Sequence, residues 1–267
     1  MILDELQLNG KNKGFALKDI QSLRDDELYY GDFGRKYLSN SDIGALLNNP
    51  RNFRKPGTPT VAMLQGRYFH TDLLEPQKLS EFDIVDASTR TTKTYKELGK
   101  QALLTKEVEM LSKMAKAIRM NFDFYDMIYQ VGNKFEQPMI KEIGGHLWKG
   151  KADIVSETNV IDLKTTSNID EFKYSARRYN YDSQAWLYQQ FFGRPMVFIA
   201  VEKNSFKTGL FECSDTFLEY GRQKVFKAIE VYEKFFIDKA PEDINQYYHK
   251  EHVLSYQEIY RSRLQTL

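Results

Sequence analysis

The spacing of hydrophobic residues predicts helices in the first half of the chain. Apolar side chains recur at helical intervals within residues 39–50, 61–75 and 99–128. Pro50 and Pro76 end the first two segments, because proline cannot continue a helix. The pattern therefore predicts two helices followed by one much longer helix.

Beyond residue 133 the pattern changes from helical spacing to alternation. Segments 134–142, 146–156 and 159–167 are predicted to be three consecutive strands joined by tight turns. Residues 195–203 form a near-continuous apolar run, which is typical of a strand buried on both faces, and 207–213 fits an edge strand. These segments predict the β-structure of the protein.

The intervening segments complete the expected architecture. Helices are predicted over about 170–192 and 215–238, and a polar loop over 80–98 carries a short strand at 82–86. The resulting order is α-β-β-β-α-β with additional helices. This order predicts an α/β (α+β) fold with a central mixed β-sheet flanked by helices.

The first 38 residues show little periodicity and carry both charge signs, so we expect them to be irregular. No linker-like segment follows. We therefore divide the chain into an N-terminal arm, 1–36, and a single domain, 37–267, that ends in a C-terminal helical extension. Its last residues are polar and are expected to be helical.

The amino-acid composition limits the cellular compartments and the kinds of metal or disulfide site that we expect. The chain has 267 residues, of which 42% are hydrophobic, and a formal net charge of +1. The single cysteine, Cys213, excludes an internal disulfide framework and a four-cysteine zinc or iron–sulfur site. The longest apolar run, Met196 to Val201, is too short to cross a membrane, and the acidic N-terminus lacks a secretory signal. We expect a cytoplasmic protein without membrane contact.

One stretch concentrates positive charge. No acidic residue occurs between Ile43 and Thr71, where Arg51, Arg54 and Arg67 lie. A solvated loop explains the stretch as well as a phosphate-binding surface does, so it cannot decide between them alone.

The hairpin formed by residues 150–166 carries the clearest chemistry. With a turn at 156–159, Val155 pairs with Val160, and Asp153 then faces Asp162 across two antiparallel strands. Two adjacent carboxylates repel each other unless a cation lies between them. Hard oxygen ligands suit Mg²⁺ or Mn²⁺.

Lys164 shares a strand face with Asp162 and would stand beside such a metal. It could polarise an attacking water or neutralise charge that develops on a phosphate. The carbonyl of Leu163, between them, offers one more oxygen ligand. The alternative is an exposed hairpin with ordinary surface residues.

Two further motifs lie on predicted helices. Gly66 and His70 are four residues apart on one helix face, so His70 could complete an Asp/Asp/His metal set while Gly66 permits the close approach of a backbone or ligand. Gln184 lies on one helical stripe with Tyr181 and Tyr188 and could contact DNA, although a packing face gives the same spacing.

Together these motifs resemble the PD-(D/E)XK nuclease superfamily, in its RecB/lambda-exonuclease branch and near the exodeoxyribonuclease VIII nuclease domain. The segment 37–54, with its Ser-x-Ser, helix and proline, is similar to the N-terminal motif of that last group. The resemblance covers roughly residues 37–203. It is carried by these motifs in chain order: Gly66-x3-His70, Asp153, Asp162-Leu163-Lys164 and Gln184-x3-Tyr188.

The resemblance implies a restriction-endonuclease-like core and hydrolysis of DNA phosphodiesters with two Mg²⁺ ions, for which Mn²⁺ would substitute. The implied catalytic residues are Asp153, Asp162, Lys164 and His70, and the implied metal ligands are His70, Asp153, Asp162 and the Leu163 carbonyl. The implied DNA-binding residues are Arg51, Arg54, Arg67, Gln184 and Tyr188, with Glu136 and Gly66 as outer supporting residues.

The activity implied by the resemblance is a 5′→3′ exonuclease that resects duplex DNA ends in phage-type recombination or repair. A single-strand annealing protein and a homo-oligomeric ring are the implied partners, in a bacterial or phage-infected cytoplasm. The alternatives are an endonuclease or single-strand-specific repair nuclease of the same fold, and a non-catalytic DNA-binding subunit. One cysteine excludes the iron–sulfur relatives.

Other candidates carry less. His249 and His252 are three apart in the tail without an evident third ligand, and His146 is expected to be a partly exposed strand residue. Arg177 and Arg178 precede the Gln184 motif and could meet DNA or remain solvated.

Overall fold

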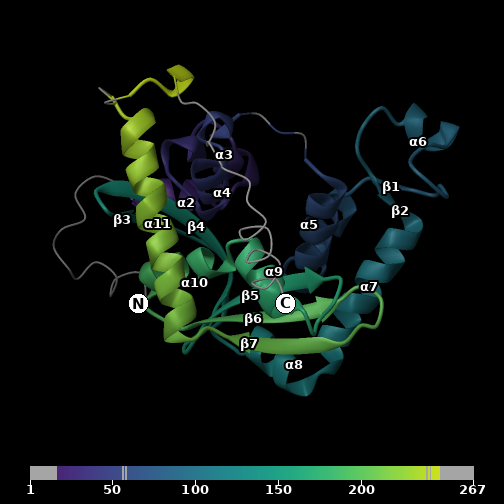
Figure 1. The fold of residues 1–267 in the computed structure, drawn as a ribbon. Helices are drawn as coiled ribbons and strands as arrows, with labels where there is room; N and C mark the ends of the chain where they lie inside the picture. The colour runs from purple at the N-terminus through teal and green to yellow at the C-terminus, as the bar shows by residue number, and fades with distance from the viewer. Residues whose placement is uncertain (1–16, 56, 58, 239, 241, 247–267) are drawn as a thin grey trace, which may run out of the picture.

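A five-stranded mixed sheet forms the centre of the protein in a computed structural model, which describes residues 17–55, 57, 59–238, 240 and 242–246 (Figure 1). The strand order is β3-β4-β5-β6-β7, and only the β5–β6 pair is parallel. The strands are β3 (Lys134–Ile143), β4 (His146–Val155), β5 (Val160–Thr166), β6 (Met196–Glu202) and β7 (Thr208–Glu212). This arrangement confirms the central mixed sheet flanked by helices.

One face of the sheet is covered by helices from both ends of the chain. The core on this face includes Trp148, Phe198, Phe191 and Val225. Helix α11 packs along α10, and Figure 1 shows the two side by side. The covering helices are α4 (Asn40–Asn48), α9 (Phe172–Arg178), α10 (Tyr181–Phe192) and α11 (Asp215–Phe235).

The other face is covered by helices from the first half of the chain. Its core includes Phe69, Leu111, Ile161 and Ile199. The covering helices are α5 (Val61–Leu74), α7 (Thr105–Met120) and α8 (Phe122–Tyr129). Because β6 contributes alternate side chains to the two cores, it is the strand buried on both faces that its apolar run predicts.

The N-terminal segment is more ordered than its sequence suggested. The expectation of an irregular arm is wrong for residues 17–36, which form α2 (Leu17–Ser22), α3 (Asp26–Tyr30) and the 3₁₀ helix η1 (Gly34–Lys36). Ile20, Leu23 and Tyr29 pack with Ile140 of β3 in a small separate core. The helices of this segment were hard to predict, because only a few of its side chains are buried and its charged residues are of both signs.

The long helix predicted over 99–128 is also wrong, because it is three elements. Strand β2 (Leu103–Leu104) pairs in parallel with β1 (Ile84–Val85), after which α7 and α8 follow. Asn121 separates the helices, since its side chain accepts from the Phe124 amide and caps α8.

Short elements fill the remaining connections. They are η2 (Pro50–Asn52), η3 (Pro76–Glu81), α6 (Lys93–Glu97) and η4 (Ile244–Gln246). No helix within the described part of the chain is long and apolar enough to cross a membrane. The helical tail predicted after residue 246, with His249 and His252, lies outside the described residues.

Candidate active site

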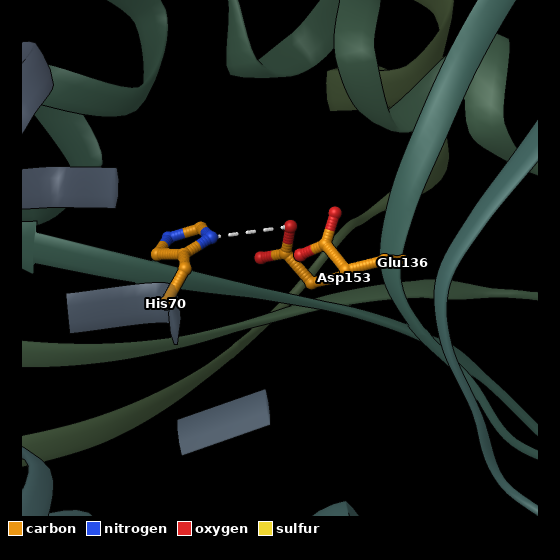
Figure 2. Close-up of side chains that lie close together, drawn as sticks. All are labelled: His70, Glu136 and Asp153. Atoms are coloured by element: carbon orange, nitrogen blue, oxygen red, sulfur yellow. Dashed lines mark ion pairs between the residues drawn. The ribbon is translucent and has the colours of Figure 1, made fainter. Parts of the chain in front are cut away.

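Three side chains from distant parts of the sequence converge beside the sheet. His70, Glu136 and Asp153 each offer a ligand atom, and these atoms all lie within 4.8 Å of one another. Figure 2 shows the His70 ring turned toward the two carboxylates, with its ion pair to Asp153 dashed. The three residues come from α5, β3 and β4, so the fold rather than a local motif assembles this group.

Local structure orients each member of the group. Thr60 caps α5 by accepting from the Met63 amide, and the helix then carries His70 toward the sheet. Glu136 has a positive φ of 46° within β3, a left-handed conformation that is uncommon for residues other than glycine. Asp153 lies in β4, opposite Glu136 between the paired positions Phe135–Ile154 and Gln137–Ala152.

His70 links the group to strand β5. Its Nε2 lies 2.8 Å from the Leu163 carbonyl oxygen, and its Nδ1 lies 3.3 Å from Asp153 Oδ1. Burial alone would lower the pKa of His70, but the charges of Asp153, Asp162 and Glu136 raise it to about 9. Without a cation, the ring is therefore protonated at neutral pH and neutralises Asp153.

Asp153 also holds the hairpin together at the site. The carboxylate accepts a 2.7 Å hydrogen bond from the Leu163 amide, where regular β4–β5 pairing has stopped. Burial opposes ionisation, yet His70, Lys164 and this hydrogen bond keep the pKa of Asp153 below its ordinary value. The predicted turn at 156–159 and the Val155–Val160 pair are confirmed.

Asp162 and Lys164 form a second, adjoining pair. Lys164 Nζ lies 2.6 Å from Asp162 Oδ2, and both side chains are largely buried. Gln184 of α10 bridges them: its amide nitrogen donates to Asp162 Oδ1 at 2.6 Å, and its carbonyl oxygen accepts from Lys164 at 3.2 Å. Among the described residues, Asp162 Oδ2 is buried without a hydrogen bond of good geometry.

The ammonium group of Lys164 is held as a cation. Burial lowers its pKa, but Asp162, Tyr181 and Asp153 outweigh that effect and raise it above the ordinary value. The ammonium also lies 4.5 Å from the centre of the Tyr181 ring, a favourable cation–π distance. It is therefore a fixed positive charge beside two carboxylates.

This donor set suits a hard divalent cation. Two carboxylates and an imidazole are ligands that Mg²⁺ and Mn²⁺ accept. The group differs from the predicted one, because Glu136 replaces Asp162 as the third clustered ligand. The Leu163 carbonyl is adjacent but is engaged by His70.

Tyr188 does not lie on the surface, where a DNA-binding residue was expected. Its side chain is buried, its hydroxyl donates to the Lys151 carbonyl, and it accepts from the Lys151 amide. This burial does not agree with a direct DNA contact. Tyr188 supports β4 two residues before Asp153, while Gln184 supports the Asp162–Lys164 pair.

The glycine of the His70 motif borders open space. Apart from its chain neighbours and the backbone of its own helix, no atom in the described structure lies within 4 Å of a Cβ built on Gly66, so the close approach of another backbone is wrong as its explanation. A ligand remains the other explanation considered for this glycine.

The three arginines expected to bind DNA are placed differently from one another. Arg51 donates to the Asn245 carbonyl, and Arg54 donates to the Tyr37 carbonyl. Arg67 is exposed on α5, three residues before His70, with its guanidinium 5.0 Å from the Phe82 ring. Arg67 is thus the one closest in sequence to the clustered ligands.

Residues outside the site behave as ordinary structural groups. His146 pairs with Glu233 at 2.8 Å near the start of β4. Burial, together with the charge of Asp162, raises the pKa of Cys213 to about 12, so its thiol is not an activated nucleophile.

Comparisons with known proteins agree with this fold. Residues 38–242 match the family described as a PDDEXK-like domain of unknown function (DUF3799). No curated protein sequence matches the chain. The crystal structure of a protein named "Putative exonuclease" from Eubacterium rectale is similar to it with a TM-score of 0.58 and 17% identity, over 92% of this chain and 98% of that one.

Two other crystal structures are more loosely similar. An alkaline exonuclease from Laribacter hongkongensis has a TM-score of 0.35 at 12% identity, over 86% of this chain and 95% of its own. A phage related exonuclease from Haemophilus somnus has a TM-score of 0.33 at 14% identity, over 73% and 93%. Of the three, the first alone is close enough to indicate a shared fold.

Proposed function

Because this chain belongs to the family of PDDEXK-like domains, we propose that it is a divalent-metal-dependent nuclease that hydrolyses DNA phosphodiesters. The observation that carries the proposal is the convergence of His70, Glu136 and Asp153 next to the Asp162–Lys164 pair. A structural ion pair would not require three carboxylates, two of them buried, in one place.

The chain supplies both metal ligands and a fixed cation. His70, Glu136 and Asp153 would hold a divalent ion, with Mg²⁺ proposed and Mn²⁺ as its substitute, and Asp162 with the Leu163 carbonyl would serve a second one. When bound, such an ion neutralises charge on phosphate oxygens and acidifies water. The proposal gives Asp153 a second task, since it also fixes β5 through the Leu163 amide.

Lys164 contributes positioning and charge in this proposal. Its ammonium, held by Asp162 and Gln184, is oriented to donate to a water or to a phosphate oxygen as negative charge develops.

The decisive experiment is digestion of end-labelled linear duplex with Mg²⁺, with EDTA, and with an Asp162→Ala variant. We expect cleavage in Mg²⁺ and none with chelator or variant. Unchanged cleavage by Asp162→Ala would overturn the catalytic assignment of this residue. Absence of cleavage by the wild-type protein in Mg²⁺ would leave the non-catalytic DNA-binding subunit as the alternative.

The finer proposal is a 5′→3′ exonuclease in phage-type recombination, working with an annealing protein and as a homo-oligomer. The similarity of segment 37–54 to the N-terminal motif of the exodeoxyribonuclease VIII group supports it. Covalently closed DNA distinguishes it from an endonuclease, because an exonuclease leaves the circle intact. Labels at the 5′ and 3′ ends report polarity.

Arg51, Arg54 and Arg67 are proposed to bind DNA phosphates, on the basis of the acid-free stretch that contains them. Each contact should contribute about 0.9 to the slope of log affinity against log salt for duplex DNA. Since Arg67 lies nearest the ligands in sequence, Arg67→Ala should lower this slope. An unchanged slope would remove Arg67 from the interface.

A further inference from the structure

Helix α9 and its C-cap residue Tyr179 expose aromatic side chains next to basic ones. Tyr174 and Tyr179 are 59% and 58% exposed, and Lys173, Arg177 and Arg178 are exposed beside them. Lys173 Nζ lies 5.0 Å from the centre of the Tyr174 ring, and Arg178 lies 5.7 Å from that of Tyr179. We call these five residues the α9 platform.

The platform is continuous with the proposed reactive centre. The ring of Tyr179 lies 6.1 Å from that of Tyr181, at an interplanar angle of 36°. The Tyr181 ring in turn lies 4.5 Å from Lys164 Nζ. An exposed aromatic surface therefore begins two rings away from the catalytic ammonium.

Among the described residues, none neutralises the charges of the platform through an ion pair. No carboxylate in the described part of the chain forms an ion pair with Lys173, Arg177 or Arg178. Exposed aromatic rings beside unpaired cations are the combination that binds single-stranded nucleic acid, because bases stack on the rings while cations follow the phosphates. A duplex hides its base faces and cannot use the rings.

We propose that the α9 platform binds a single-stranded segment of the DNA substrate, with bases stacked on Tyr174 and Tyr179 and phosphates on Arg177 and Arg178. This inference rests on the proposed nuclease function and specifies its substrate: the strand near the reactive centre is unpaired. The sequence alone did not decide whether Arg177 and Arg178 contact DNA or are only solvated. Their exposed aromatic neighbours favour contact with DNA.

The test measures binding of fluorescently labelled oligothymidylate, in EDTA so that no cleavage occurs. A second oligonucleotide of the same length carries abasic sites, which keep the phosphates and remove the bases. Stacking predicts that the wild-type protein binds the thymidylate about tenfold or more tightly than the abasic strand. Equal affinities would overturn the proposal without any variant.

Substitutions then locate the effect. Tyr174→Ala/Tyr179→Ala should lose the preference for thymidylate, whereas Tyr174→Phe/Tyr179→Phe should keep it, since phenylalanine retains the ring. Tyr125→Ala is the matched control, because Tyr125 is an exposed tyrosine of α8 on the opposite face of the sheet. Loss of the preference in the control but not in the α9 variant would contradict the assignment.

The wild-type protein alone separates this inference from the nuclease proposal. If the wild-type protein cleaves DNA with Mg²⁺ but shows no base preference, the nuclease stands and the platform falls. If it prefers thymidylate over abasic strands yet cleaves no DNA, the platform stands and the nuclease falls. Arg177→Gln/Arg178→Gln should lower the salt slope by more than about 0.7, the value expected for one contact to a single strand.

Discussion

Glu136 and Asp153 face each other across strands β3 and β4, with carboxylate oxygens within 4.8 Å. Burial, followed by the charge of Asp153, raises the pKa of Glu136 to about 7. The Glu136 backbone is also in the left-handed region, at φ 46°. Both features cost stability in the free protein, and a cation bound between the carboxylates would offset the repulsion.

A Glu136→Gln variant should therefore bind Mn²⁺ more weakly. Removing one anionic ligand from a three-residue group should reduce the affinity by about tenfold or more, as loss of supporting groups at metal sites commonly does. Isothermal titration calorimetry measures this directly, without DNA. Glu233→Gln, which changes an exposed glutamate paired with His146, is the control. Equal Mn²⁺ affinity for wild type and Glu136→Gln would exclude Glu136 as a ligand.

The same residue should make metal-free stability depend on pH. Because the folded pKa of Glu136 lies above its ordinary value of 4.5, the folded state holds this proton more tightly than the unfolded state does. The free energy of unfolding should then decrease as pH rises from about 4.5 to 7. Urea unfolding in EDTA at several pH values measures the decrease, which should be smaller in Glu136→Gln. The same decrease in both proteins would contradict the prediction.

Gln184 is predicted to act through Asp162 and Lys164, both of which it contacts. Replacing it with methionine keeps the length and removes both hydrogen bonds, so the turnover number should fall by about 10- to 100-fold. The KM for DNA should change little, since Gln184 does not need to touch the substrate in this role. The pH profile of kcat should also shift, because the Lys164 ammonium loses a fixed acceptor. An effect confined to KM would instead favour the direct DNA contact.

The hairpin chemistry was predictable because it depends on local parity. The turn at 156–159 sets the register, and alternation then places Asp162 and Lys164 on one face, opposite Ile161 and Leu163. No comparable rule places His70 beside this hairpin, because His70 in α5 and Leu163 in β5 are 93 residues apart in the sequence. His70 could be assigned to the site only because four motifs, in their order along the chain, resemble those of the PD-(D/E)XK nucleases.

Glu136 was underestimated for a physical reason. Strand parity groups Glu136 with Lys134 and Pro138, but parity alone does not give the β3–β4 register that places Glu136 opposite Asp153. Sequence carries no reliable signal for a left-handed glutamate. The break between α7 and α8 was hidden similarly, because apolar spacing continues across Asn121 and the cap is visible only in the structure.

Substitution of Gly66 by alanine distinguishes an effect on helix stability from an effect on DNA cleavage. Alanine is favoured over glycine inside a helix by about 1 kcal/mol, and the added methyl meets no described atom within 4 Å beyond the chain neighbours and backbone of its own helix. Gly66→Ala should therefore raise the melting temperature. If substrate occupies the open space beside His70, the same variant should cleave DNA more slowly through a higher KM.

Gly44 in α4 provides the matched control, since its added Cβ would meet only the Asn180 amide nitrogen, at an ordinary 3.5 Å. Gly44→Ala should gain similar stability and keep full cleavage activity, because α4 packs against α11 away from the clustered ligands. Thermal melts in EDTA and initial rates with Mg²⁺ give the two readouts. Stability and activity should thus move in opposite directions for Gly66→Ala alone. If Gly66→Ala is as active as Gly44→Ala, no substrate atom approaches this helix face, and the glycine has no functional explanation at this site.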